Sequence, residues 1–332
     1  MTALITRSIF RCLLSGLLTD LCSPTKTPAV KPFSFIIITY NRPGDALELL
    51  ENIVGLDGSA DLLEEVVLVN NASTADYSAV ARFAESRQEV PIRYIMAPGN
   101  LGVARGRNFA VGFSKAPLLI MLDDDAVLQN KDCLLRLQEE FERPSARPRA
   151  IISFKVLYYD TLKLQKNTLP HKRFSEYKDK SFFETYFYAG GAHAIRRSVL
   201  EEVGHYPEDF FYGMEEYDLS YRILDKGFSI AYSDRVVMLH KESPLGRKPK
   251  ADKVRMMWVN KSKVAWRYLP KLYFYTTAFM WSLQYLKETG FDWKGFREGW
   301  RQVGAISTSE GRQTISPHTL RYLRSLGARL WY

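Results

Sequence analysis

The stretch FSFIIITYN, residues 33–41, decides the fold, because a run of β-branched and aromatic residues ends abruptly in polar ones. VVLVNN at 66–71 and LLIMLDDD at 118–125 repeat this form. One further strand and three helical patterns lie between the three runs, at 92–96, 45–54, 79–86 and 103–113. Continuous apolar strands that alternate with helices predict an α/β fold with a mostly parallel sheet flanked by helices.

Polar side chains follow these strands at the point where each strand ends. Thr39 and Asn41 follow the first run, Asn70 follows the second, and Asp123–Asp125 follow the third. Because the carboxyl ends of parallel strands meet at one edge of a sheet, ligands bind there. We therefore expect these residues to line one crevice.

The three aspartates are the sharpest local feature of the sequence. Adjacent carboxylates repel one another, and a divalent cation is the natural counter-charge. In an extended segment Asp123 and Asp125 point to the same side, so the two can share one metal ion. His240 follows the apolar run VVML and is a candidate third ligand. The structural alternatives are a solvated acidic turn for the aspartates and a packing role for His240.

Glu215 and Glu216 form a second acidic site, between the aromatic run DFFYGM and the helical pattern SYRILDKG. The helix dipole alone favours carboxylates at a helix start, so the pair needs no function. A carboxylate beside an aromatic-walled pocket, however, has its pKa raised toward that of a useful general base. Glu216 and Glu215 are therefore candidate catalytic bases, and we expect Asp218 to orient the helix.

The segment NLGVARGRN, residues 100–108, combines glycines, a helix start and two arginines. Helix N-termini and arginine both favour a diphosphate. The segment matches neither G-x-G-x-x-G nor a Walker loop, so it carries no dinucleotide or ATP fingerprint. Packing of a helix against the sheet explains it equally well.

Composition and charge set the broad class and the location. The 332 residues are 46% hydrophobic and 25% charged, as in a folded globular protein. Three cysteines without C-x-x-C spacing build neither a disulfide framework nor a zinc site, so we expect a reducing, cytoplasmic location. The net charge of +9 divides into −3 for residues 1–240 and +12 for residues 241–332. Basic tails bind anionic surfaces, either membranes or nucleic acids.

The chain divides into three parts. We expect an N-terminal extension and linker over 1–32, the α/β domain over 33–240, and a basic, aromatic, helical region over 241–332. Residues 5–18 fit an amphipathic or poorly ordered extension, or a misassigned start, better than a cleaved signal peptide. No apolar run reaches about 18 residues, so no spanning helix is expected. The apolar run at 272–286 suits a helix that lies on a membrane or packs on the body.

Six segments, taken in their order along the chain, resemble the motifs of a known protein family. They are FIIITYNRP, VVLVNNAS, NLGVARGRN, LLIMLDDDAVL, the long run from YAGGAHAIRR through FFYGMEEYDLSYRILDKGF, and VVMLHKES. Over about Phe33 to Leu269 this series resembles the family 2 glycosyltransferases, which have the Rossmann-like GT-A fold. The resemblance implies inverting transfer of a sugar from a nucleoside-diphosphate sugar to a hydroxyl of a glycan or lipid-linked acceptor, as in polysaccharide and cell-envelope synthesis.

The resemblance also implies roles for individual residues. Residues that bind the nucleotide sugar would be Thr39, Asn41, Asn70, Arg105, Asn108, Asp123 and Asp124. Asp125, Asp123 and His240 would hold Mg²⁺ or Mn²⁺, and Glu216, beside Glu215, would be the general base. The family pattern has aspartate where this chain has Asn70, so the nucleotide stays open among UDP, dTDP and GDP.

Two other functions remain alternatives: a nucleotidyltransferase-like sugar-nucleotide enzyme, and a non-catalytic relative that binds glycan or nucleotide. We expect no nucleic-acid partner, because no binding module is present and the acidic clusters oppose a phosphate backbone. The basic, aromatic tail instead favours peripheral contact with the anionic inner face of a membrane.

Overall fold

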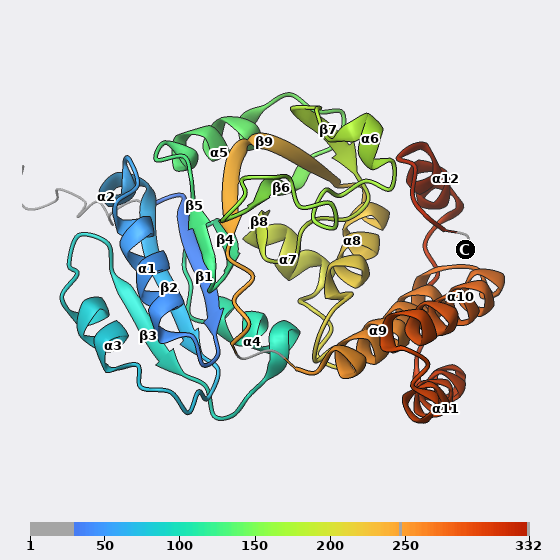
Figure 1. Ribbon diagram of the computed structural model, residues 1–332. Coiled ribbons are helices and arrows are strands. Elements are labelled where there is room, and N and C mark those ends of the chain that lie inside the picture. Colours follow the sequence, from blue (N-terminus) through green and yellow to red (C-terminus); the bar gives the residue numbers. More distant parts are fainter. Residues whose placement is uncertain (1–29, 246–247, 331–332) are drawn as a thin grey trace, which may run out of the picture. The chain divides into compact units, whose positions relative to one another are not determined.

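The computed structural model describes residues 30–245 and 248–330. The expectations for residues 1–29 lie outside the described residues. From Lys31 onward the chain forms one compact unit, which is shown in Figure 1.

Nine strands of the described residues form one sheet, in the order β3-β2-β1-β4-β8-β6-β9-β5, with β7 paired to β9. Their bounds are β1 (Phe33–Thr39), β2 (Leu63–Asn70), β3 (Ile92–Met96), β4 (Leu118–Asp123), β5 (Ala126–Leu128), β6 (Arg149–Tyr158), β7 (Phe182–Thr185), β8 (Ala192–Arg196) and β9 (Ser229–His240).

Strands β1 to β4 form the parallel half of the sheet. Thr39 in β1 lies opposite Asn70 in β2, and Ile38 in β1 lies opposite Asp123 in β4. The carboxyl ends of three strands therefore meet at one edge. The other half mixes directions, because β8 is antiparallel to both β4 and β6, while β9 is parallel to β6. This arrangement confirms the α/β fold with a sheet dominated by parallel strands and flanked by helices.

Twelve helices are present in the described residues. They are α1 (Pro43–Val54), α2 (Ser59–Leu62), α3 (Ser78–Glu85), α4 (Gly102–Val111), α5 (Cys133–Glu142), α6 (Phe174–Tyr177), α7 (Arg197–Val203), α8 (Glu215–Asp225), α9 (Lys250–Tyr268), α10 (Lys271–Thr289), α11 (Trp293–Ser309) and α12 (Pro317–Ser325). The helices expected between the first four strands are found within a few residues of their predicted bounds.

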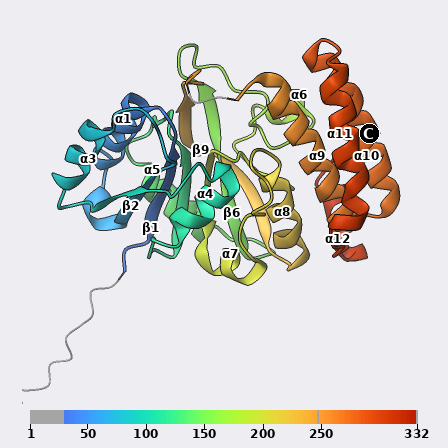
Figure 2. The same cartoon turned by 90° about the horizontal axis from the view of Figure 1, so that it is seen from below.

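The sheet is buried on both faces, which explains its continuous apolar strands. In β1, Phe35 and Ile37 face a core shared with α1 and α5, whereas Ile36 faces a core shared with α4, α7 and α8. Successive side chains of a strand point to opposite faces, so an uninterrupted apolar run supplies both cores at once. Figure 2 shows α1 and α3 on one side, and α4, α7 and α8 on the other.

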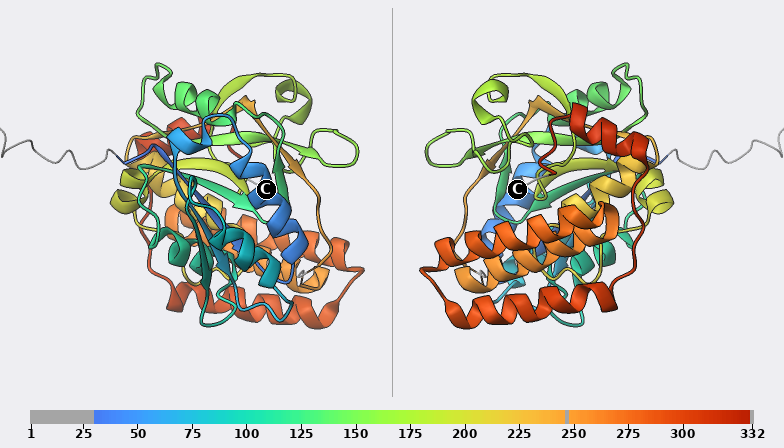
Figure 3. Two further views of the ribbon diagram at one scale, coloured as in Figure 1. Left: turned by 90° about the vertical axis from the view of Figure 1, so that its left-hand side faces the viewer. Right: turned by 90° about the vertical axis from the view of Figure 1, so that its right-hand side faces the viewer.

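Helices α9, α10 and α11 form a layer beside α8 (Figure 3). Trp258 at the centre of α9 is fully buried and donates its indole N–H to the carbonyl of Ala278 in α10 at 2.9 Å. Its ring meets Trp300 of α11 edge-on, with the centroids 5.5 Å apart. The same hydrophobic core includes Leu219 and Tyr221 of α8. The C-terminal helices therefore pack on the helix that carries Glu215 and Glu216.

Candidate active site

Two adjoining cavities of about 600 and 550 Å³ form one cleft, and both are lined by Arg107, Asp123 and Tyr212. The first, which we call the sheet-edge lobe, lies at the carboxyl ends of β1 and β4 and is lined by residues that include Tyr40, Arg42, Asn71, Asp123, Asp124, Asp125 and His240. The second, the helical lobe, is lined by residues that include Tyr186, Glu215, Glu216, Tyr217, Lys261 and Trp281.

The predicted residues after β1 and β2 lie at the sheet edge but do not line the lobe themselves. The Thr39 hydroxyl lies 2.6 Å from that of Tyr77, and Asn70 donates to the Tyr94 hydroxyl at 2.7 Å. The Asn41 side chain accepts the backbone N–H groups of residues 74 and 75. These side chains shape the loops, and their sequence neighbours Tyr40, Arg42 and Asn71 line the cavity instead. The rule that ligands bind at strand ends therefore located the loops that line the cavity. It did not show which side chains of those loops point into the cavity.

Asp124 is buried and faces a cation. Arg42 donates to its Oδ1 at 2.7 Å, and the backbone N–H of Tyr40 donates to Oδ2 at 3.3 Å. Burial outweighs the attraction of Arg42 and raises the pKa of Asp124 to about 6. Asp124 therefore fixes Arg42 in the lobe, a contact that the sequence alone did not indicate.

Asp125 and His240 lie together because β5 follows the aspartates and pairs with β9. Ala126 is opposite His240, and His240 Nε2 is 3.3 Å from Asp125 Oδ1. The backbone N–H of Ser243 donates to Asp125 Oδ2 at 2.9 Å. Burial alone would raise the pKa of Asp125, but the hydrogen bond and charge of His240, with Arg42 beside them, hold it below its ordinary value.

The predicted metal ligands fit a divalent cation. Asp123, Asp125 and His240 each offer a ligand atom, and these atoms lie within 4.8 Å of one another. Asp123 is the open member, with 44% of its side chain exposed. His240 Nδ1 lies 3.1 Å from Gln165 Oε1, a contact that orients the ring with Nε2 toward the aspartates. Two carboxylates and an imidazole suit Mg²⁺ or Mn²⁺, so the donor set agrees with the prediction.

Gly191 allows the open aspartate to lie where it does. The backbone N–H of Asp123 donates to the Gly191 carbonyl at 3.1 Å, and a Cβ on Gly191 would overlap the Asp123 carboxylate. In the structure, Gly191 leaves room for Asp123.

Helix α4 contributes Arg107 rather than the two residues that the sequence singled out. Arg105 donates to the Glu208 carbonyl at 2.7 Å and Asn108 to the Tyr206 carbonyl at 2.9 Å, and both line a separate hollow outside the cleft. Residues 105 and 108 share one face of the helix, and 107 points to the opposite face. The expected nucleotide contact of Arg105 and Asn108 is therefore corrected. The helical spacing of the segment could have identified Arg107.

Arg107 joins the two lobes. Its guanidinium lies 3.0 Å from Glu215 Oε1 and 3.5 Å from Asp123 Oδ1. The ion pair with Glu215 is buried on both sides, whereas the one with Asp123 is open to solvent on the carboxylate side. Arg107 therefore links the metal-ligand cluster to the first turn of α8.

The two glutamates of α8 have different surroundings. Both line the helical lobe, and Glu215 is the buried one that Arg107 holds in an ion pair. Burial, with the negative charge of Glu215, raises the pKa of Glu216 to about 8. The structure therefore distinguishes an ion-paired glutamate from one whose pKa lies near neutral pH.

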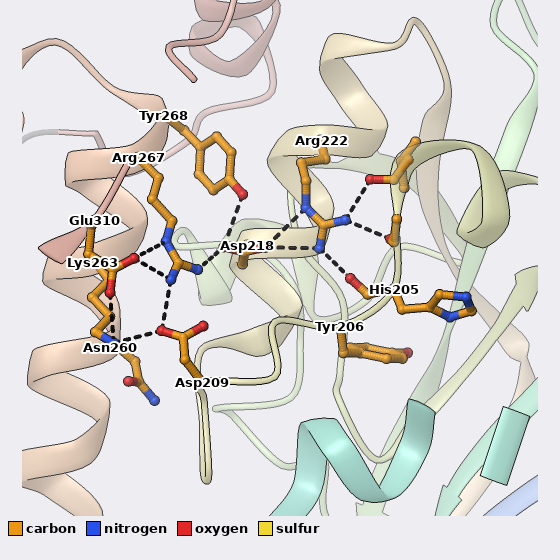
Figure 4. A network of polar contacts seen from close by, with 12 residues as sticks. His205, Tyr206, Asp209, Asp218, Arg222, Asn260, Lys263, Arg267, Tyr268 and Glu310 are labelled. Carbon is orange, nitrogen blue, oxygen red and sulfur yellow. Dashed lines mark hydrogen bonds and ion pairs between the residues drawn. The ribbon is translucent and has the colours of Figure 1, made fainter. Parts of the chain in front are cut away.

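Asp218 fastens α8 to α9, as Figure 4 shows. Its Oδ1 accepts from Arg222 at 2.9 Å, and its Oδ2 accepts from Arg267 and Tyr268, each at 3.0 Å. Arg267 also pairs with Asp209 and Glu310, at 2.7 and 2.6 Å. Asp218 thus orients the helix that presents Glu216, as its place in the sequence predicted.

Two curated proteins resemble this chain in sequence. An uncharacterized protein of Haemophilus influenzae is 28% identical over 177 residues, which are 52% of this chain and 92% of that protein. The low-salt glycan biosynthesis hexosyltransferase Agl10 of Haloferax volcanii is 22% identical over 222 residues, which are 63% of this chain and 67% of that protein.

Solved structures agree on the fold. The mannosyltransferase PcManGT of Pyrobaculum calidifontis, in complex with GDP-Man and Mn²⁺, aligns over 96% of this chain and 86% of its own, with a TM-score of 0.55 and 19% identity. Residues 1–349 of S. aureus TarS, in complex with UDP-GlcNAc, align over 89% of this chain and 88% of their own, with a TM-score of 0.56 and 14% identity. The chain spans 42% of a longer TarS chain.

The Pyrobaculum protein is a mannosyltransferase, and this chain aligns with it over nearly its whole length, so the predicted GT-A fold is confirmed. The family model described as glycosyl transferase family 2 matches residues 34–204, just over half of the sequence. The chain is therefore a glycosyltransferase that belongs to family 2.

Proposed function

We propose that the enzyme transfers a sugar, with inversion and with a divalent metal, from a nucleoside-diphosphate sugar to a hydroxyl of a glycan or lipid-linked acceptor. The observation that carries this proposal is the two-lobed cleft. The candidate metal ligands lie on one side of Asp123 and Arg107, and Glu216 lies on the other. Membership of family 2 favours sugar transfer over a nucleotidyltransferase or a non-catalytic relative.

The sheet-edge lobe would bind the donor. Asp123, Asp125 and His240 would hold Mg²⁺ or Mn²⁺, which supplies positive charge to the leaving diphosphate. Arg42 and Arg107 bring two guanidiniums to the same lobe, and guanidiniums suit phosphate oxygens. The complexes of the Pyrobaculum enzyme with GDP-Man and Mn²⁺ and of TarS with UDP-GlcNAc support a donor of this class.

The helical lobe would bind the acceptor. Glu216, as a carboxylate, takes the proton of the acceptor hydroxyl, and the oxygen attacks the anomeric carbon. The new C–O bond forms as the bond to the diphosphate oxygen breaks on the opposite face, so the configuration inverts. Glu215 does not need to move a proton, because its ion pair with Arg107 already occupies Oε1.

The test of this function is turnover. The enzyme is incubated with UDP-, dTDP- and GDP-sugars, Mn²⁺ or chelator, and glycan or lipid-linked acceptors, and the product is read by mass and by NMR at the new anomeric centre. We expect metal-dependent transfer from one donor, with the configuration opposite to that of the donor. Retained configuration, or equal rates with chelator, would contradict the inverting, metal-assisted step.

A membrane face on α10 would bring the enzyme to a lipid-linked acceptor. None of the described helices is long and apolar enough to cross a bilayer. Helix α10 nevertheless exposes an apolar stripe at spacings of three and four residues, formed by Leu272, Tyr275, Phe279 and Leu283. Lys271 and Lys287 bracket the stripe, as in a helix that lies at an anionic interface. We propose that α10 rests on the cytoplasmic face of a membrane in cell-envelope polysaccharide synthesis.

The membrane contact is tested with vesicles of phosphatidylcholine, with and without phosphatidylglycerol. The double change Tyr275→Ser and Phe279→Ser should release the protein from the anionic vesicles. Tyr159→Ser, an exposed tyrosine outside α10, is the matched control and should bind as the wild type does. Unchanged binding of the α10 variant would remove this helix from the membrane contact.

A further inference from the structure

The helical lobe contains a buried ammonium that the mechanism does not use. Lys261 on α9 is 5% exposed and lines the lobe, with Nζ 3.0 Å from the centroid of the Tyr217 ring. In the described part of the chain, Lys261 makes no hydrogen bond and no ion pair within 4.0 Å. Burial lowers the pKa of Lys261 to about 7, although the negative charge of Glu216 opposes this shift. Beside the face of the Tyr217 ring and the negative charge of Glu216, this ammonium can still donate a hydrogen bond to a group bound in the lobe.

A second donor without a partner lies in the same cavity. The indole N–H of Trp281 on α10 is buried and lacks a hydrogen-bond acceptor among the described residues, and the side chain lines the helical lobe. Buried Trp N–H groups usually find a partner. Two elements, α9 and α10, thus each direct a donor to one cavity.

The charge around this cavity is positive. Besides Lys261, the lining includes three further cationic side chains, Lys166, Lys172 and Arg329. Of the acidic lining residues, Glu215 and Asp123 are already paired with Arg107. Counted with Arg107 and Glu216, the lining holds five cationic side chains and three carboxylates, a formal surplus of two positive charges. An anionic group on the bound sugar would balance part of this formal surplus, and a neutral sugar would not.

We propose that the acceptor carries an anionic group, a phosphate or a carboxylate, which Lys261 and Trp281 bind so that the acceptor hydroxyl reaches Glu216. This inference rests on the proposed function, and it specifies the chemical class of the acceptor in the proposed reaction. A charged hydrogen bond from the ammonium and a neutral one from the indole would together orient the group. The phosphate of a lipid-linked sugar and the carboxylate of an acidic sugar share this chemistry, so the test must separate them.

Binding is measured first, by calorimetry, with methyl phosphate and with acetate as probes. The enzyme carries Mg²⁺ and whichever nucleoside diphosphate binds it, so that the sheet-edge lobe is filled. We expect Lys261→Met to weaken binding of the probe about tenfold to a hundredfold, since a charged hydrogen bond is lost. Trp281→Phe keeps an aromatic ring and removes the N–H, and should weaken binding several-fold. Lys250→Met, on the exposed part of α9, is the matched control and should bind as the wild type does.

Turnover then identifies the source of the anion. One hydroxyl-bearing sugar is offered as a lipid diphosphate, as a uronate glycoside and as a neutral glycoside. Lys261→Met should raise KM for the anionic acceptor about tenfold or more and leave KM for the donor unchanged. Lys261→Arg should restore most of the affinity. If Lys261 acts only through the charge of Glu216, Lys261→Met will shift the pH profile equally for neutral and anionic acceptors, and the inference is wrong.

The outcomes separate the two proposals. If the nucleoside diphosphate binds with metal but neither anion binds, or if both anions bind Lys261→Met as tightly as the wild type, the anionic acceptor is refuted and the proposed function stands. A preference for the neutral glycoside also refutes it. If no nucleoside diphosphate binds a well-folded enzyme, the proposed function fails, and the inference fails with it.

Discussion

The two lobes of the cleft differ in how the chain builds them. The sheet-edge lobe takes Arg42, Asn71 and its aspartates from strand ends and the residues that follow them, while α4 and other loops supply the rest of its lining. The helical lobe takes residues from α8, α9 and α10, and it acquires its walls only when the C-terminal helices pack on α8. The difference teaches that local sequence pattern accounts for the strand ends of the sheet-edge lobe, whereas the walls of the helical lobe depend on how the C-terminal helices pack.

The largest effect should follow from removing the base in the helical lobe. Glu216→Gln keeps the size of the side chain and removes the proton acceptor, so transfer should fall about 10²- to 10⁴-fold. Binding of the nucleotide should stay unchanged, because that binding belongs to the other lobe. Steady-state rates and calorimetry with the nucleoside diphosphate measure the two effects.

Two matched glutamates sharpen this test. Glu202→Gln changes an exposed residue of α7 and should leave the rate unchanged. Glu215→Gln weakens the hold on Arg107 and should lower the rate less than Glu216→Gln does. If Glu215→Gln costs more than Glu216→Gln, the roles of the two residues are exchanged.

Asp218 tests whether α9 holds the helical lobe in place. Asp218→Asn removes the carboxylate shared by Arg222 and Arg267, both of which are largely buried. The free energy of unfolding should fall by about 2–4 kcal/mol, since two guanidiniums lose a charged partner. Urea denaturation measures this loss. Asp225→Asn, at the other end of α8, is the control. Equal losses of stability in the two variants would show that Asp218 does not hold α8 against α9.

Features of the site that depend on local sequence pattern could be predicted, and features that depend on contacts between distant segments could not. The apolar runs predicted β1, β2 and β4, and the strand-end rule predicted where Asp123 and Asp125 lie, because both follow from local pattern. His240 was found through the strand before it, although its pairing with Asp125 depends on the contact between β5 and β9. The family resemblance points to Arg105 and Asn108, whereas the helical spacing of α4 places Arg107 on the face toward the cleft.

The contributions of Lys261 and Trp281 could not be read locally. Each lies in an amphipathic helix whose pattern indicates only that one face is buried. Which helix it packs against depends on tertiary contacts between segments 40 or more residues apart, such as that of Lys261 with Tyr217. The sequence therefore indicated the acidic residues of both lobes and missed the residues that α9 and α10 contribute to the helical lobe.

A substitution at Gly191 tests whether the position of Asp123 matters for the sheet-edge lobe, without changing any charge. Gly191→Ala places a methyl group against the Asp123 carboxylate and changes no charge. The open metal ligand must shift, so metal-dependent affinity for the donor should fall about tenfold. Gly190→Ala meets no atom closer than 3.7 Å and is the matched control. Equal affinity in the two variants would show that Asp123 does not need its present position.

The pH dependence of the rate should give the smallest effect. Glu216 has a raised pKa of about 8 and must be a carboxylate to accept a proton, so kcat/KM should rise between about pH 7 and pH 8 and level off above. Glu215, Arg107 and Lys261 are the charged groups that surround it. The rise should be about tenfold per pH unit below the pKa and should be absent in Glu216→Gln. A rate that falls with rising pH over this range would contradict Glu216 as the base.

The central claim is that the sheet-edge lobe binds a nucleoside-diphosphate sugar through a metal on Asp125 and its neighbours. Its most direct test is the melting temperature of the wild type and Asp125→Asn with UDP-, dTDP- and GDP-sugars, each with Mn²⁺ and with chelator. We predict that one donor raises the melting temperature of the wild type by a few degrees with Mn²⁺ only, and that Asp125→Asn loses this rise. Stabilisation that persists with chelator or in Asp125→Asn, or its absence for every donor in well-folded wild type, would contradict the claim.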